Sequence, residues 1–117
     1  MSARVIVENG TGHAKRVGGC GTLFQIALVS RTYRPQVAWL TCLQNFTIRP
    51  GRNIYRIPIT ATYLQCSQSR RPPPGQKACL RRGMPPLPPG HYHAELFQST
   101  RLFPSPPAIP VLVTPAT

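Results

Sequence analysis

Apolar and polar residues alternate with a period of two along most of the chain, a pattern typical of half-buried β-strands. No window of eleven residues carries an uninterrupted apolar stripe at helical spacing, and fifteen prolines interrupt the chain. The pattern therefore predicts an all-β protein of about seven strands with negligible helix. The predicted strands are residues 4–9, 22–30, 36–42, 45–48, 53–66, 91–98 and 109–114.

The longest predicted strand, residues 53–66, shows the alternation most clearly. Its even-numbered positions are mostly polar, whereas its odd-numbered positions are apolar and predict a core face. Pro58 has no backbone N–H to donate, so we expect this strand at a sheet edge or with a bulge there. Pro50 and Gly51 predict a tight reversal before it, because proline presets φ and glycine adopts positive φ readily. The predicted core face is Tyr55, Ile57, Ile59, Ala61 and Tyr63.

Short strands that recur about every ten residues between turn signals are typical of an antiparallel β-sandwich. We expect a single domain over residues 1–117, because a chain of this length supports one modest core. The proline-laced segment near the C-terminus belongs to this domain, since the strand 109–114 follows it. Only residues 115–117 are expected to fray.

The hexapeptide LPPGHY at residues 87–92 gives a more specific signal. It places a leucine, then Pro-Gly, then Tyr92 at the entry of a late strand. This resembles the tyrosine corner of immunoglobulin-like and fibronectin type III-like domains. The resemblance implies an immunoglobulin-like sandwich in which the Tyr92 hydroxyl bonds to upstream backbone. Cys20 and Cys42 flank Trp39, but Cys42 follows it too closely for the antibody-type disulfide arrangement.

Four cysteines in a short, loop-rich chain favour two disulfides, and so an oxidising compartment. Their spacing lacks the paired C-x2-C pattern of zinc sites, and free buried thiols are the main alternative. Four cysteines allow three connectivities. Pairing nearest neighbours in the sequence predicts the disulfides Cys20–Cys42 and Cys66–Cys79.

The charge is strongly unbalanced, at +12, with 14 lysines and arginines against two acidic residues, Glu8 and Glu95. Such a field attracts nucleic acid, anionic lipid or acidic polysaccharide without specifying which. The positive residues are spread along the chain, and only residues 70–82 form a cluster. This cluster lies in the segment CSQSRRPPPGQKACLRRG, residues 66–83.

The segment 66–83 has the composition of an exposed loop, and a disulfide between its two cysteines would staple it. A nucleic-acid-binding arm would normally also carry aromatic side chains that stack on bases, and residues 66–90 contain none. We therefore predict a stapled, basic, proline-rich surface loop. An acidic partner is expected to contact this loop before any other surface, and the alternative is an exposed loop that keeps the protein soluble and binds nothing specific. The candidate binding residues are Arg70, Arg71, Lys77, Arg81 and Arg82.

The sequence offers little for catalysis or metal binding. There is no aspartate for a Ser-His-Asp triad, and a carboxylate pair would have to be the two glutamates themselves. His91, His93 and Glu95 share one face of a predicted strand, but together they span about 13 Å, too far for one ion. A solvent-facing polar strand explains them. We expect no enzyme activity, no metal and no cofactor.

The run from GCGTLFQIAL through LPPGHYHAELFQS to PPAIPVLVTP looks like small secreted or cell-envelope β-sandwich proteins of actinobacteria. That resemblance implies export and a non-catalytic role. The N-terminus has no charged-then-apolar leader, so the chain is either cytosolic or has lost its signal peptide, and the cysteines favour the latter. No apolar run approaches the roughly 18 residues of a membrane span.

These features predict a secreted or cell-envelope binding or structural module. Its basic loops and edge strands would meet another protein or an anionic envelope polymer. The alternative is a basic nucleic-acid-binding protein, such as a viral or phage structural component, for which the net charge is the whole argument. The oligomeric state and the identity of any ligand have no signal in the sequence.

Overall fold

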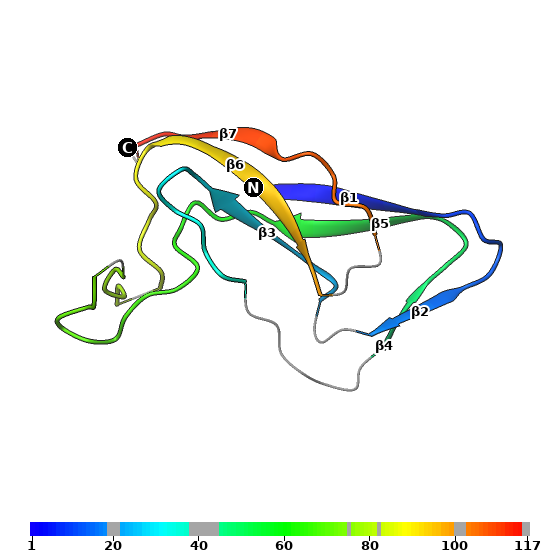
Figure 1. Ribbon diagram of the computed structural model, residues 1–117, viewed down its shortest axis with the longest axis horizontal. Helices are drawn as coiled ribbons and strands as arrows, with labels where there is room; N and C mark the ends of the chain where they lie inside the picture. Colours follow the sequence, from blue (N-terminus) through cyan, green and yellow to red (C-terminus); the bar gives the residue numbers. More distant parts are fainter. Residues whose placement is uncertain (19–21, 38–44, 75, 82, 100–102, 116–117) are drawn as a thin grey trace.

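Seven strands and no helix form the part of the chain that the computed structural model describes, namely residues 1–18, 22–37, 45–74, 76–81, 83–99 and 103–115 (Figure 1). The all-β prediction is confirmed. Every strand pairing is antiparallel, in the orders β1–β5, β2–β4 and β3–β6–β7. The strands are β1 Ser2–Asn9, β2 Lys15–Gly18, β3 Phe24–Val29, β4 Asn45–Ile48, β5 Gly51–Pro58, β6 Gly90–Gln98 and β7 Ile109–Val113. No helix long and apolar enough to cross a membrane occurs in these residues.

Three segments differ from the sequence prediction. The segment predicted as a strand over 53–66 is a strand only as far as Pro58, which lies opposite Ser2 in the ladder. One further bond, from the Ile59 N–H to the Met1 carbonyl at 2.8 Å, closes the ladder. The strand β2 was not predicted, since four residues show no clear period. Residues 36–37 are not in a strand, and the rest of the predicted strand 36–42, including Trp39, lies outside the described residues.

The register of β1 against β5 sends the odd-numbered side chains of both strands into the core. Val5 lies opposite Tyr55, and Ala3 lies opposite Ile57. The predicted core face of β5 is confirmed at Tyr55 and Ile57, and it continues past the strand at the partly buried Ile59. Ala61 is exposed because the chain has left the ladder by that point, whereas Tyr63 is again partly buried and packs against the core, as predicted.

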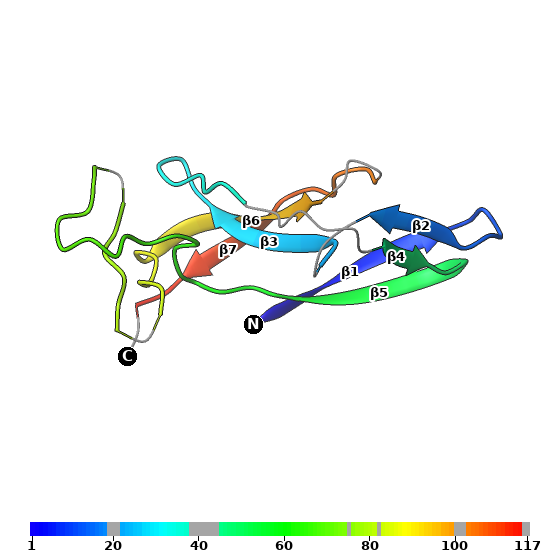
Figure 2. The same ribbon diagram turned by 90° about the horizontal axis from the view of Figure 1, so that it is seen from below.

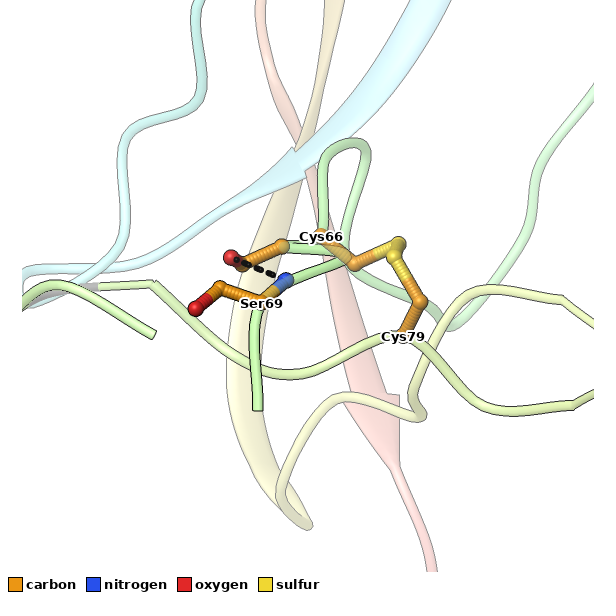
Figure 3. The surroundings of a disulfide bond; sticks show 4 residues. Cys66, Ser69 and Cys79 are labelled. Carbon is orange, nitrogen blue, oxygen red and sulfur yellow. Dashed lines mark hydrogen bonds between the residues drawn. A yellow bond between two sulfur atoms is a disulfide. The ribbon is translucent and has the colours of Figure 1, made fainter. Parts of the chain in front are cut away.

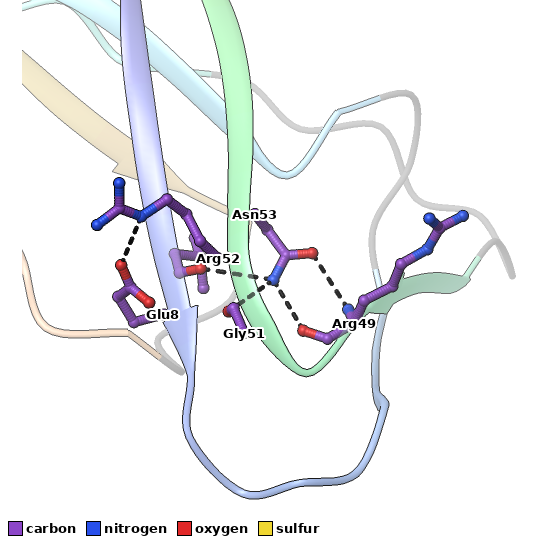
Figure 4. A network of polar contacts seen from close by, with 6 residues as sticks. Glu8, Arg49, Gly51, Arg52 and Asn53 are labelled. Carbon is purple, nitrogen blue, oxygen red and sulfur yellow. Dashed lines mark hydrogen bonds and ion pairs between the residues drawn. The ribbon is translucent and has the colours of Figure 1, made fainter.

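The β1–β5 ribbon folds back on itself as β2 and β4 at one end of the molecule (Figure 1). Two asparagines hold the two turns that make this possible. Asn9 is buried, and its Nδ2 donates to the carbonyls of His13 at 2.8 Å and Ile48 at 3.1 Å. Asn53 Nδ2 donates to the Arg49 carbonyl at 2.8 Å (Figure 4).

The prediction of a tight reversal at Pro50 and Gly51 is confirmed. Gly51 has φ of 90°, a value that a residue with a Cβ adopts only with strain. The Asn53 side chain closes the turn from within, because its Oδ1 accepts from the Arg49 N–H at 3.2 Å (Figure 4). The same side chain therefore satisfies both the N–H and the carbonyl of Arg49.

The sheet β3–β6–β7 lies across the β1–β5 ribbon, with β3 over β5, and the core fills the space between these two layers (Figure 2). The core has two parts that meet at Ile26. One part lies toward the folded-back ribbon and contains Val7, Val17, Leu23, Phe24, Ile48 and Ile57. The other lies toward the opposite end and contains Leu28, Leu87, Tyr92, Ala94 and Val113.

The segment LPPGHY adopts the local geometry that its resemblance to a tyrosine corner implies. Leu87 is 4% exposed, and the Tyr92 hydroxyl donates to the Pro88 carbonyl at 2.7 Å. Burial, and then the neighbouring Tyr63 and Tyr33 side chains, raise the pKa of the Tyr92 phenol above its ordinary value. The neutral phenol is therefore the form that the folded protein favours.

We expect Tyr92→Phe to lower the free energy of unfolding at pH 7 by about 1 kcal/mol, the usual net contribution of one hydrogen bond. A raised pKa stabilises the fold fully below the pKa of about 10 in the unfolded chain, and this stabilisation is lost as pH rises through the folded pKa. The difference between wild type and variant should therefore narrow above pH 10. Urea unfolding at pH 7 and at high pH measures it, and a difference that stays constant would contradict the assignment.

Candidate functional site

The basic, proline-rich segment leaves the two layers as a loop at the end opposite to β2 and β4 (Figures 1 and 2). A short antiparallel contact closes the base of this loop. The Tyr63 N–H donates to the Pro85 carbonyl at 3.0 Å, and the Leu87 N–H donates to the Ala61 carbonyl at 2.9 Å. The Tyr33 hydroxyl accepts from the Leu64 N–H at 3.0 Å, which ties the segment that enters the loop to the body of the protein. These hydrogen bonds hold both ends of the loop in a fixed position on the body of the protein.

The predicted disulfide Cys66–Cys79 is present, with the two Cα atoms 4.9 Å apart (Figure 3). The predicted partner disulfide, Cys20–Cys42, lies outside the described residues. The disulfide closes a loop with a sequence separation of 13. On the chain-entropy model, this restricts the unfolded chain and stabilises the fold by about 3 kcal/mol.

Hydrogen bonds order the interior of the stapled loop, residues 66–83. Ser67 donates its N–H to the Lys77 carbonyl at 2.7 Å and accepts the Cys79 N–H at 2.9 Å. The Ser69 N–H bonds to Ser67 Oγ at 3.2 Å (Figure 3), and Ser69 Oγ accepts the Arg71 N–H at the same distance. The backbone next to Arg71 and Lys77 is thereby positioned by the loop itself.

The structure brings four of the five predicted binding residues onto this loop as exposed side chains: Arg70, Arg71, Lys77 and Arg81. The fifth, Arg82, lies outside the described residues. None of the four makes an ion pair with a carboxylate in the described part of the chain. The loop therefore presents positive charge that no carboxylate of the described residues neutralises.

Both acidic side chains of the protein are already paired elsewhere. Glu8 accepts from Arg52 Nε at 2.9 Å on the outer face of the β1–β5 ribbon (Figure 4). Glu95 accepts from Arg34 at 3.2 Å beside β6. Such exposed pairs add little stability. Their consequence is electrostatic, because they leave the other described lysines and arginines without an internal counterion.

Sequence reasoning did not find a groove of about 600 Å³ between β1 and β7. Met1 to Ile6 form one wall, and Pro106 to Leu112 contribute the other. Core residues, including Ile26, Ile59 and Leu96, form the floor. The sequence shows Ile109 and Leu112 as apolar residues of a strand, but it does not show that the structure leaves both exposed. It also could not indicate the groove, because the opposite wall comes from residues at the other end of the chain.

The face of β6 that carries the histidines is solvent-facing, as expected. His91 and His93 are exposed, and Glu95 is held by Arg34. No group of three histidine, cysteine or acidic side chains in the described ranges lies close enough together to hold a metal ion. The arrangement supplies exposed charge and an apolar groove, which are features of binding.

Comparisons with protein-family models, curated proteins and solved structures found no match to this chain. The protein is therefore described by its own fold and candidate site. It is an all-β protein of antiparallel sheets with a disulfide-stapled basic loop. Any function has to be argued from that loop and from the groove.

We expect the paired substitution Cys66→Ser and Cys79→Ser to lower the free energy of unfolding by up to about 3 kcal/mol, because the unfolded chain regains its loop entropy. The two layers of strands should survive, since neither cysteine belongs to either part of the core. Urea unfolding and a β-type circular dichroism spectrum measure both effects. Complete loss of the β spectrum in the absence of urea would show that the loop is needed to form the layers.

Proposed function

We propose that this protein is a non-enzymatic binding module whose stapled loop recognises an acidic protein or an anionic polymer. The observation that supports this is the set of four exposed cations, Arg70, Arg71, Lys77 and Arg81, without an internal carboxylate partner. A loop that is closed by a disulfide and by its own hydrogen bonds loses less entropy when it binds. Guanidinium groups also suit bidentate recognition of carboxylate and phosphate.

The architecture that we propose for this module is an immunoglobulin-like β-sandwich. Two features favour it: the two strand layers that enclose the core, and the bond from the Tyr92 hydroxyl to the Pro88 carbonyl. In such sandwiches, loops gather at the ends of the strands and serve as recognition surfaces. The position of the stapled loop at one end is consistent with that use.

We also propose that the protein works outside the cytosol, secreted or in a cell envelope. The Cys66–Cys79 disulfide supports this, because structural disulfides persist in oxidising compartments. Among anionic partners, an envelope polymer or another exported protein fits that setting better than nucleic acid. The loop also lacks the aromatic side chains on which nucleobases stack.

Binding to polyglutamate and to duplex DNA, each titrated over a range of salt concentrations, tests this function. We expect replacement of Arg70, Arg71, Lys77 and Arg81 by serine to weaken polyglutamate binding at low salt at least tenfold. The salt slope should fall by roughly one for each cation removed that contacts the polymer. Exposed charges of this kind act mainly on the association rate.

The matched control removes four exposed cations elsewhere, by serine substitution at Lys15, Arg16, Arg31 and Arg49. If it weakens polyglutamate binding as much as the loop variant does, net charge alone explains the attraction, and the loop is not the docking surface. Tighter binding to duplex DNA than to polyglutamate, with a steeper salt slope, would favour the nucleic-acid-binding alternative.

A further inference from the structure

The groove between β1 and β7 collects apolar side chains that the fold leaves uncovered. Seven large hydrophobic residues are exposed in the described residues, and four of them line this groove: Met1, Ile6, Ile109 and Leu112. Ile109 and Leu112 are each 61% exposed. An apolar surface that gathers in one groove indicates an interaction site, whereas single exposed apolar residues do not.

The groove runs beside a strand edge with free backbone groups. β1 pairs only with β5 in the described part of the chain. The Ile59 N–H bonds to the Met1 carbonyl, and hydrogen-bonded and non-bonded pairs alternate along an antiparallel ladder, so the odd-numbered residues of β1 bond to β5. The N–H and carbonyl groups of the even-numbered residues therefore point to the free edge. These residues are Ser2, Arg4, Ile6 and Glu8.

The opposite wall of the groove, formed by β7 and the chain before it, is less suited to hydrogen-bond with an added strand. β7 contains Pro110, which has no N–H, and a proline within a ladder fits with its nitrogen toward the free edge. The preceding chain adds Pro106 and Pro107 to the same wall. By contrast, β1 contains no proline along its eight residues. A strand that enters the groove would thus hydrogen-bond to β1, and β7 would supply only apolar contact.

Charge decides what kind of strand fits. Arg4 lines the groove, and it lies directly opposite Arg56 on the outer face of the ribbon; among the described residues, no carboxylate is paired to either. Two like charges placed opposite each other are unfavourable until an acidic group comes near. A second copy of this chain carries +12 and would bring more positive charge to the edge. The occupant that fits is therefore acidic.

We propose that an extended segment of a partner protein, with alternating apolar and acidic residues, binds by adding a strand to the free edge of β1. Its backbone bonds to the even-numbered residues of β1. Its apolar side chains enter the groove over Ile26, Ile59 and Leu96, and its acidic side chains lie on the outer face near Arg4 and Arg56. Strand addition of this kind takes affinity from the main chain and specificity from alternate side chains. The site is separate from the stapled loop, and neither proposal depends on the other.

The test uses an acetylated and amidated octapeptide of alternating glutamate and valine, titrated into the ¹⁵N-labelled protein. We expect saturable shifts and slowed hydrogen exchange at the amides of Ser2, Arg4, Ile6 and Glu8. A peptide of the same composition with its valines in one block, and an alternating lysine–valine peptide, should each bind at least tenfold more weakly. Absence of binding, equal binding of the block or lysine peptide, or shifts confined to other strands would overturn the proposal.

Two substitutions of Arg4 distinguish the contribution of its backbone N–H to peptide binding from that of its side-chain charge. Arg4→Ala removes the charge and keeps the N–H, so the preference for glutamate over lysine peptides should shrink. Arg4→Pro also removes an N–H that faces the free edge, without removing a β1–β5 hydrogen bond, and should weaken binding further. Equal affinities of these two variants for the glutamate peptide would show that the β1 edge is not paired.

Two exposed positions keep the test valid if Arg4→Pro does not fold. The double substitution Ile109→Ser and Leu112→Ser removes apolar surface from the far wall and should weaken binding at least fivefold. The control, Ile54→Ser, changes an equally apolar side chain that is 52% exposed on the outer face of β5 and does not line the groove. Equal losses in the two variants, or protection of the β1 amides by self-association without peptide, would overturn the proposal.

Discussion

The register between β1 and β5 is the constraint on which the rest of the structure depends. Because Ser2 pairs with Pro58, the odd-numbered side chains of both strands enter the core, where Val7 and Ile57 are buried. If β1 slipped by one residue against β5, its apolar side chains would turn to solvent and Arg4 would turn toward the core. The same register directs the backbone groups of the even-numbered β1 residues to the free edge. Core, charged outer face and open edge thus follow from one pairing.

Two asparagine side chains help to fix the register between β1 and β5. The buried Asn9, the last residue of β1, and Asn53, near the start of β5, donate to backbone carbonyls at the two reversals and so hold the turns that flank the ladder. The few carboxylates act differently, since Glu8 and Glu95 are exposed and each neutralises one arginine. The protein is therefore held by apolar contacts and neutral hydrogen bonds, while its cations stay available at the surface.

In the described part of the chain, the β1–β5 ribbon has two strands and the sheet packed on it has three, β3, β6 and β7, so both layers are narrow. Narrow layers enclose the core along β3 and β5 but leave it open between β1 and β7, where the groove lies. The stapled loop leaves from one end of the same layers (Figure 1). The protein thus offers two surfaces of different physical character. One is a charged loop that acts at long range, and the other is an apolar edge that requires an extended chain.

The sequence by itself determined the features that depend on neighbouring residues. The period of two predicted strands without helices, Pro50 and Gly51 predicted the reversal, LPPGHY predicted the bond of the Tyr92 hydroxyl, and the nearest cysteines predicted Cys66–Cys79. Tertiary structure decided where β5 ends, because the strand extends only as far as its pairing with β1, in which Pro58 lies opposite Ser2. It also decided the groove, whose walls come from residues 1–6 and 106–112 and meet only when the two layers pack. Pairing of distant strands leaves no local pattern, so both features had to be seen in the folded chain.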